Sequence, residues 1–231
     1  MARSFPTADI EVIPGVEITT ELDGRELHLL GYFVKLDHRR LVTTLDQLCE
    51  RRRERFHAYI SELSRRGYTI PADRARLVEN ASASPGRRHV AGLLLECGLA
   101  RTQNEVFHRM LAPLRDSVIP KHKLAIDEAI QLVHEAGGVA SLAHPPSDLS
   151  EEAYSRLQAM RLDAIEVEYA WGRSARPNRL RELAARFGFA MTGGSDCHGP
   201  NPKHRHIGSY AIAADSLEHL RERCSRQIAD E

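Results

Sequence analysis

The sequence predicts an α/β fold with a largely parallel sheet. Short apolar runs in its second half alternate with stretches of helical periodicity, and glycines stand where a helix ends and a strand begins. The expected strands there are 139–143, 164–169 and 189–192, and the expected helices are 126–136, 151–160 and 177–187. Such alternation is typical of βα units whose strands lie parallel in one sheet.

Two earlier apolar runs, 10–18 and 27–34, predict an antiparallel pair of strands before the parallel part. The segment that joins them contains Asp23-Gly24. An Asp-Gly dipeptide favours a type I′ turn, because both central residues of that turn need a positive φ. We therefore expect a hairpin in this part of the chain.

Residues 36–120 differ in character and predict a helical insertion domain. Three helices are expected there, at 41–67, 90–97 and 104–111. Gly98 would end the second helix, and Thr102 would be the N-cap of the third. The α/β body would then consist of residues 1–35 and 121–231.

The composition indicates a soluble cytoplasmic protein. Of the 231 residues 42% are hydrophobic and 28% are charged, and the 32 basic residues equal the 32 acidic ones, so no global basic surface indicates nucleic acid. The short basic run at 51–53 is expected to be a solvated helix face. No apolar run approaches the ~20 residues that span a bilayer, so no membrane partner is expected. The N-terminus does not resemble a secretory signal, and the 4 cysteines lie far apart, as reduced thiols do.

Histidines and carboxylates at the ends of the expected strands are the candidates for metal chemistry. They are Glu17, His28, His144, Asp196 and His198. Each alone has an ordinary explanation: a lone strand histidine is more often structural than a ligand, and an Asp beside glycines is often a turn residue. Their joint occurrence favours a metal site, since α/β proteins build such sites beyond the carboxyl ends of strands. The segment Gly193-Gly194-Ser195-Asp196-Cys197-His198 is the most specific, because its Asp and His would face one cleft.

Four stretches carry a family resemblance that covers nearly the whole chain. They are PGVEITTELDGRELHLLGY, RRHVAGLLLECG, AIQLVHEAGGVASLAHP and TGGSDCHG. In this order they resemble the PHP superfamily (polymerase and histidinol phosphatase), in its stand-alone phosphoesterase branch. That branch includes a nucleotide bisphosphatase and an enzyme that trims RNA 5′ ends. The resemblance implies a distorted (β/α)₇ barrel with up to three divalent ions, and hydrolysis of a phosphomonoester by metal-bound water.

The resemblance also implies a role for each matching residue. Glu17 would bridge two metals, and His28 and His144 would complete one of these sites. Asp196 would ligate another metal and His198 a third.

Substrate contacts are implied at Arg87 and His89 in the insertion. Both could equally be solvated residues at a helix start, although a helix N-terminus there would suit an anion. Lys121 is a weaker candidate for the same role.

The chain departs from the family pattern at its beginning. The family opens with a His-x-His strand and then an Asp-His-Asp strand, and neither precedes the stretch that starts at Glu11. We therefore expect an incomplete barrel and one well-formed site, that of Glu17, His28 and His144. A homodimer, strand exchange or a separate polypeptide would cover the open edge. Such a ligand set accepts zinc, manganese or iron.

Two functions stay open on the sequence alone. The first is a metal-dependent phosphoesterase that acts on a nucleotide or a short nucleic-acid end. With depleted ligand sets, this chain by itself would have weak or undetectable phosphatase activity. The second is a catalytically degenerate relative that binds a metal or phosphate ligand in a regulatory or assembly role. A mononuclear iron oxygenase rests on ligand type alone.

Overall fold

The computed structural model describes residues 11–114, 120–170, 177–197 and 206–229. The chain forms two compact units, residues 1–41 with 123–231 and residues 42–122. The first unit is the α/β part that carries the predicted metal ligands. None of the helices in the described segments has both the length and the apolar character that crossing a membrane requires.

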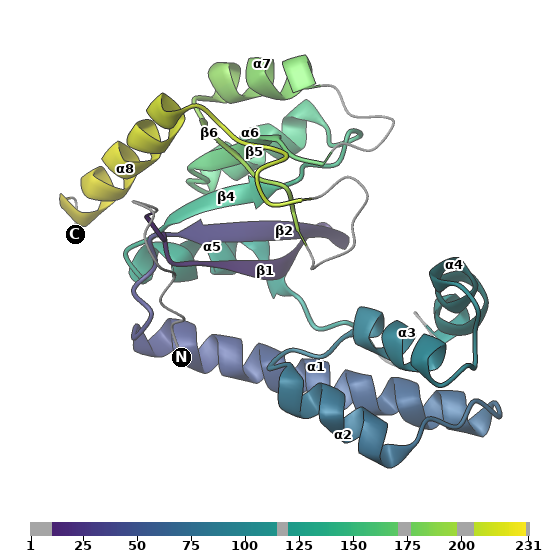
Figure 1. Ribbon diagram of the computed structural model, residues 1–231. Coiled ribbons are helices and arrows are strands. Elements are labelled where there is room, and N and C mark those ends of the chain that lie inside the picture. The colour runs from purple at the N-terminus through teal and green to yellow at the C-terminus, as the bar shows by residue number, and fades with distance from the viewer. Residues whose placement is uncertain (1–10, 115–119, 171–176, 198–205, 230–231) are drawn as a thin grey trace. The chain divides into compact units, whose positions relative to one another are not determined.

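A six-stranded mixed sheet forms the first unit (Figure 1). Its strands are β1 (Gly15–Leu22), β2 (Arg25–Tyr32), β3 (Leu124–Ala125), β4 (Val139–Ala143), β5 (Ala164–Glu168) and β6 (Ala190–Gly193). The order across the sheet is β3-β1-β2-β4-β5-β6. The pair β1–β2 is antiparallel, and β4, β5 and β6 are mutually parallel. The predicted α/β class is thus confirmed, with a barrel that the described strands leave open.

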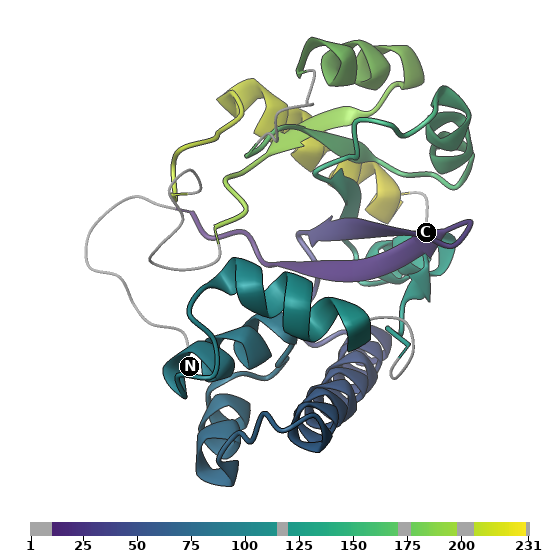
Figure 2. The same cartoon turned by 90° about the vertical axis from the view of Figure 1, so that its right-hand side faces the viewer.

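The helices of this unit cover both faces of the sheet. They are α5 (Ile126–Glu135), α6 (Glu151–Ala159), α7 (Pro177–Phe187) and α8 (Ala214–Ala229). Val133 of α5 lies against the face of Gly31, whereas Leu220 of α8 clusters with Val139. Val139 pairs with Tyr32, the residue after Gly31, so α5 and α8 pack on opposite faces. Helices α6 and α7 lie side by side near β5 and β6 in both views (Figures 1 and 2).

The described part of the second unit is helical, apart from its connecting segments. It comprises most of α1 (Arg39–Arg65), then α2 (Ala72–Ala81), α3 (Arg87–Glu96), α4 (Gln103–Glu105), the π-helix η1 (Val106–Leu111) and the 3₁₀ helix η2 (Ala112–Leu114). Its core joins Phe56, Tyr59 and Leu63 of α1 to Leu93 and Leu94 of α3 and to apolar residues of η1. In the basic run, Arg51 and Arg53 pair with acidic residues of their own helix, as a solvated face does.

The predicted hairpin is present, but the bounds predicted for its strands are wrong. Its turn consists of Asp23 and Gly24, with φ of 52° and 76°, so the ladder continues to Leu22 and Arg25. The first strand covers Gly15–Leu22, so residues 11–14 of the predicted run are not part of it, and residue 10 lies outside the described residues. Glu17, predicted at the end of its strand, lies near the start of β1.

Four of the described elements are not among the predicted ones, namely α2, η2, α8 and the two-residue β3. Helix α8 is rich in charged residues and buries Leu220, so its apolar stripe is weak in the sequence. The third predicted helix of the insertion is a short α-turn followed by a π-helix. Its predicted N-cap is confirmed, because Thr102 Oγ1 accepts a hydrogen bond from Glu105 N at 3.1 Å.

Candidate metal centre

The β1–β2 hairpin carries two of the predicted ligands on one face. Thr19 of β1 pairs with His28 of β2, and Glu17 precedes Thr19 by two residues. Because side chains alternate along a strand and paired residues share a face, Glu17 and His28 are diagonal neighbours. Ile18 and Leu29 point to the other face and are buried. Burial of that apolar face fixes which way both ligands point.

The third predicted ligand follows strand β4. Ala143 of β4 pairs with His28 of β2, so His144, the next residue, leaves the sheet beside His28. Its φ is 30°, an unusual value for a residue with a side chain. Non-glycine residues in this region are enriched at functional sites, where the surrounding structure has to hold them.

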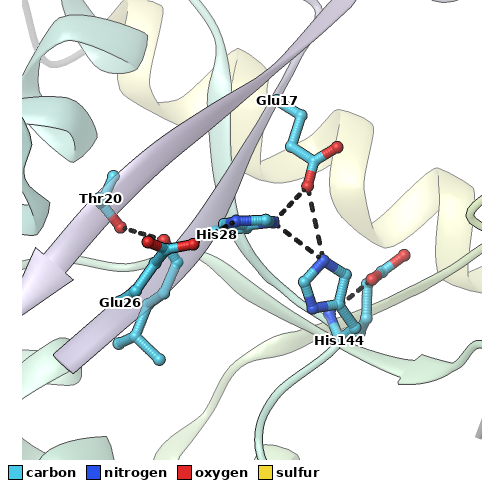
Figure 3. A network of polar contacts seen from close by, with 7 residues as sticks. Glu17, Thr20, Glu26, His28 and His144 are labelled. Atoms are coloured by element: carbon cyan, nitrogen blue, oxygen red, sulfur yellow. Dashed lines mark hydrogen bonds and ion pairs between the residues drawn. The ribbon is translucent and has the colours of Figure 1, made fainter. Parts of the chain in front are cut away.

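Glu17, His28 and His144 bring their ligand atoms to within 4.8 Å of one another (Figure 3). Oε1 of Glu17 lies 2.7 Å from Nδ1 of His28 and 3.4 Å from Nε2 of His144. The two ring nitrogens are 3.2 Å apart. Ligand atoms around a tetrahedral ion with metal–ligand distances of ~2.1 Å lie roughly 3.4 Å apart, so this triad fits a divalent cation with little rearrangement.

The electrostatics of the centre also favour a cation. Hydrogen bonds from His144 and then from His28 hold the pKa of Glu17 far below its usual range, so Glu17 is a carboxylate. The pKa of His144 is raised, chiefly by its hydrogen bond to Glu17, and the charges of Glu166 and Asp196 act in the same direction. Several carboxylates therefore surround two imidazoles, an arrangement that a bound cation would neutralise.

Two further carboxylates adjoin the ligands, and the strand pattern did not indicate them. Oε1 of Glu26 lies 3.5 Å from Nε2 of His28, the ring nitrogen that faces away from Glu17 (Figure 3). A carboxylate on the second nitrogen of a metal-ligating histidine commonly fixes its tautomer and ring orientation. Glu166 of β5 accepts a hydrogen bond from the backbone N–H of His144. Burial raises the pKa of Glu166 to about 7. The signal that could have identified Glu166 in the sequence is the presence of a glutamate inside the apolar run 164–169.

Of the two remaining predicted ligands, Asp196 lies among the described residues and His198 does not. Asp196 follows β6 with a φ of 48°, and its charge affects the pKa of both His144 and Glu166, so it lies near the triad. Among the described residues the metal-compatible group consists of Glu17, His28 and His144. His198 lies outside the described residues.

The predicted substrate residues belong to the second unit, as does Lys121. Arg87 begins α3, and Nδ1 of His89 accepts a hydrogen bond from Gly86 N at 3.1 Å. Burial and the nearby Arg52 lower the pKa of His89, which favours the neutral ring. His89 thus caps the start of α3, a structural role that the sequence did not reveal.

The fold and the donor set fit an α/β metal-dependent phosphoesterase, and a comparison with solved structures supports this class. A solved structure from Bifidobacterium adolescentis, assigned to the metal-dependent phosphoesterases, superposes with a TM-score of 0.80 at 26% identity. The match covers 91% of this chain and 76% of that one. No family model matches the chain.

Curated relatives identify the family. The 5′-3′ exoribonuclease Rnm of Salmonella typhimurium is 33% identical over 198 residues, which cover 84% of this chain and 67% of the exoribonuclease. The 3′,5′-nucleoside bisphosphate phosphatase of Chromobacterium violaceum is 25% identical over 204 residues, or 86% of this chain and 72% of the phosphatase. The chain belongs to the PHP superfamily of phosphoesterases.

Proposed function

We propose that this chain is a divalent-metal-dependent phosphoesterase that removes a phosphate group from a nucleotide or from the end of a short nucleic acid. The observation that carries the proposal is the convergence of Glu17, His28 and His144 in a chain of this superfamily. The similarity to an exoribonuclease and to a nucleoside bisphosphate phosphatase supports the substrate class.

The proposed cofactor is one divalent ion at the triad, either zinc, manganese or iron. Two imidazoles and one carboxylate suit all three metals and leave a coordination position open. When bound, such an ion supplies Lewis-acid activation of water and of a phosphoryl oxygen. Glu26 would keep the ring of His28 oriented toward the ion.

The negative charge of the site determines what a phosphate substrate needs in order to bind. A phosphomonoester dianion that approaches Glu17 and Asp196 meets two carboxylates, so the cation has to neutralise the site before the ester binds. We propose, as the family resemblance implies, that Arg87 and His89 contact the substrate phosphate; both lie in the first turn of α3, and the N-terminus of a helix is compatible with an anion.

We further propose that the chain forms a homodimer. Among the described residues, the ladder between β1 and β3 covers only Thr20 and Glu21. Within the described part of the chain, no ladder is recorded along the rest of the outer edge of β1, and a second copy could pair with the backbone there. Light scattering would give the mass of the assembly, and a monomer at micromolar concentration would contradict this part of the proposal.

The test of the function uses the 231-residue protein stripped of metal with a chelator. Zinc, manganese or iron(II) is then added singly, and phosphate release is measured from a 3′,5′-nucleoside bisphosphate and from a 5′-phosphorylated RNA oligonucleotide. We expect slow hydrolysis that requires metal and is lost in His28→Ala and His144→Ala. His219→Ala, an exposed position on α8, serves as the matched control. Tight metal binding without hydrolysis of either substrate would contradict the proposal and favour a binding role.

A further inference from the structure

Glu166 is a buried carboxylate on the face of the sheet that holds the metal centre. It is 5% exposed, and its partner across the β5–β6 ladder is Thr192. Below it, Ser141 Oγ and Thr192 Oγ1 lie 2.8 Å apart in a buried hydrogen bond. A glutamate in such a place loses much hydration, so the interactions that it makes must compensate for that loss.

Oε2 of Glu166 accepts a hydrogen bond from the backbone N–H of His144 at 2.6 Å. His144 is the residue whose φ of 30° takes the chain out of β4 and turns its ring toward Glu17 and His28. A left-handed backbone costs free energy for a residue with a Cβ, and an acceptor placed on its N–H offsets that cost. By accepting the N–H of His144, Glu166 thus stabilises the left-handed backbone conformation of His144.

The same region of β5 reaches two further points near the site. Tyr169 Oη donates a hydrogen bond to Pro145 O at 2.7 Å and so fixes the residue after His144. Oε1 of Glu166 lies 3.9 Å from the position that a Cβ atom on Gly194 would occupy, so this oxygen is close to Gly194. Gly194 opens the loop that leads to Asp196. Glu166 therefore lies between the loops that follow β4 and β6.

We propose that Glu166 is a positioning residue of the metal centre: by accepting the His144 N–H, it holds that histidine in the left-handed conformation in which its ring can ligate a cation. The proposal rests on the proposed function for its catalytic meaning, but not for its test. Glu166 acts through His144 and is not assigned as a ligand. The proposal concerns the reach of the Glu166 side chain to the N–H of His144.

Two substitutions separate reach from charge. Glu166→Gln keeps an oxygen at the same distance and removes the charge, whereas Glu166→Asp keeps the charge and withdraws the oxygen by one methylene group. Affinity for zinc alone is measured by competition with a chromophoric chelator, on protein whose folding is checked by circular dichroism. We expect Glu166→Asp to weaken zinc binding about tenfold or more, and Glu166→Gln to stay within about threefold of the wild type.

Asp163→Ala is the matched control. Asp163 is also a buried carboxylate at β5, and it accepts the N–H of Ala140 at 2.8 Å. That bond lies four residues before His144, on the order of 13 Å along β4. The control should lower stability and leave zinc affinity unchanged, so a loss shared by all three variants would mean general damage to β5 and overturn the proposal.

The reverse order of the two variants would also overturn it. If Glu166→Gln weakened zinc binding and Glu166→Asp did not, the charge of Glu166 would be the cause. If neither variant changed the affinity, Glu166 would have no part in positioning. Failure of the proposed function would look different: the wild type would bind zinc with the expected ranking of variants and still release no phosphate.

Discussion

Nδ1 of His28 lies 3.2 Å from Nε2 of His144, although the two residues are 116 positions apart in the chain. The register of β2 against β4 brings them together, since Ala143 is the partner of His28. The two imidazole nitrogens and the Glu17 oxygen face one another, and few protons are available to form hydrogen bonds among these three atoms. A divalent cation between them would satisfy all three groups at once, so the native fold should bind metal far better than the unfolded chain.

Metal binding should therefore raise thermal stability. At a free concentration 100 times the dissociation constant, a ligand specific for the native state adds about 2.7 kcal/mol. For a chain of this size, this corresponds to roughly 5–10 °C in Tm. We expect that shift with zinc in differential scanning fluorimetry, its reversal by a chelator and its loss in His144→Ala. An equal shift in His144→Ala would place the stabilising ion elsewhere.

Glu26 should tune the affinity of the centre without being a ligand. It lies beside Nε2 of His28, and second carboxylates of this kind commonly change metal affinity tenfold or more. At 3.5 Å the contact is long, so we expect Glu26→Ala to weaken zinc binding several-fold, measured by chelator competition. Glu21→Ala is the control, because Glu21 pairs with Glu26 across the hairpin and contacts Lys123 instead. Similar losses in both variants would indicate a general effect of negative charge.

The pair formed by Asp163 and His134 should stabilise the fold. Asp163 Oδ2 lies 2.7 Å from Nε2 of His134 and also accepts the N–H of Ala140. Asp163→Ala leaves a buried donor without its acceptor, which should cost about 2–4 kcal/mol in the free energy of unfolding, measured with urea. Asp148→Ala, which breaks an exposed ion pair with Arg25, should change it little. A small effect at both positions would mean that water replaces the lost acceptor.

Much of the α/β part follows from local signals in the sequence. Asp23-Gly24 indicated the hairpin, and Gly137 and Gly188 have the positive φ expected after a helix. The bounds of β1 were missed because Val12 and Ile13 extend the apolar run without joining the ladder. The closeness of Glu17, His28 and His144 depends on the sheet register, which strand patterns alone do not fix.

Other features left weak signals or none. Glu166 lies on a strand whose two faces are both largely buried, so no polar and apolar alternation marks the direction of its side chain. His89 caps α3 through its ring nitrogen, a role usually filled by shorter side chains. Glu26 was hidden because its importance comes from the histidine next to which the fold places it.

The two adjacent glycines at the end of β6, Gly193 within the strand and Gly194 just after it, differ in what surrounds them. A Cβ at Gly193 would lie 2.5 Å from Glu168 O and 2.9 Å from Ile212, and the first of these is backbone. A Cβ at Gly194 would meet nothing closer than Oε1 of Glu166 at 3.9 Å. The close approach of β5 and β6 therefore requires a glycine at the first position only.

Gly193→Ala should thus damage the loop that carries Asp196, whereas Gly194→Ala should not. The added methyl group at Gly193 forces β6 away from β5, which should cost about 1–3 kcal/mol of stability and weaken metal binding because the loop shifts. Urea unfolding and zinc competition on both variants would check this, with Gly194→Ala as a control of identical chemistry one residue away. If Gly194→Ala had the larger effect on zinc affinity, the backbone of the loop at Gly194, rather than the contact between the strands, would control the position of Asp196.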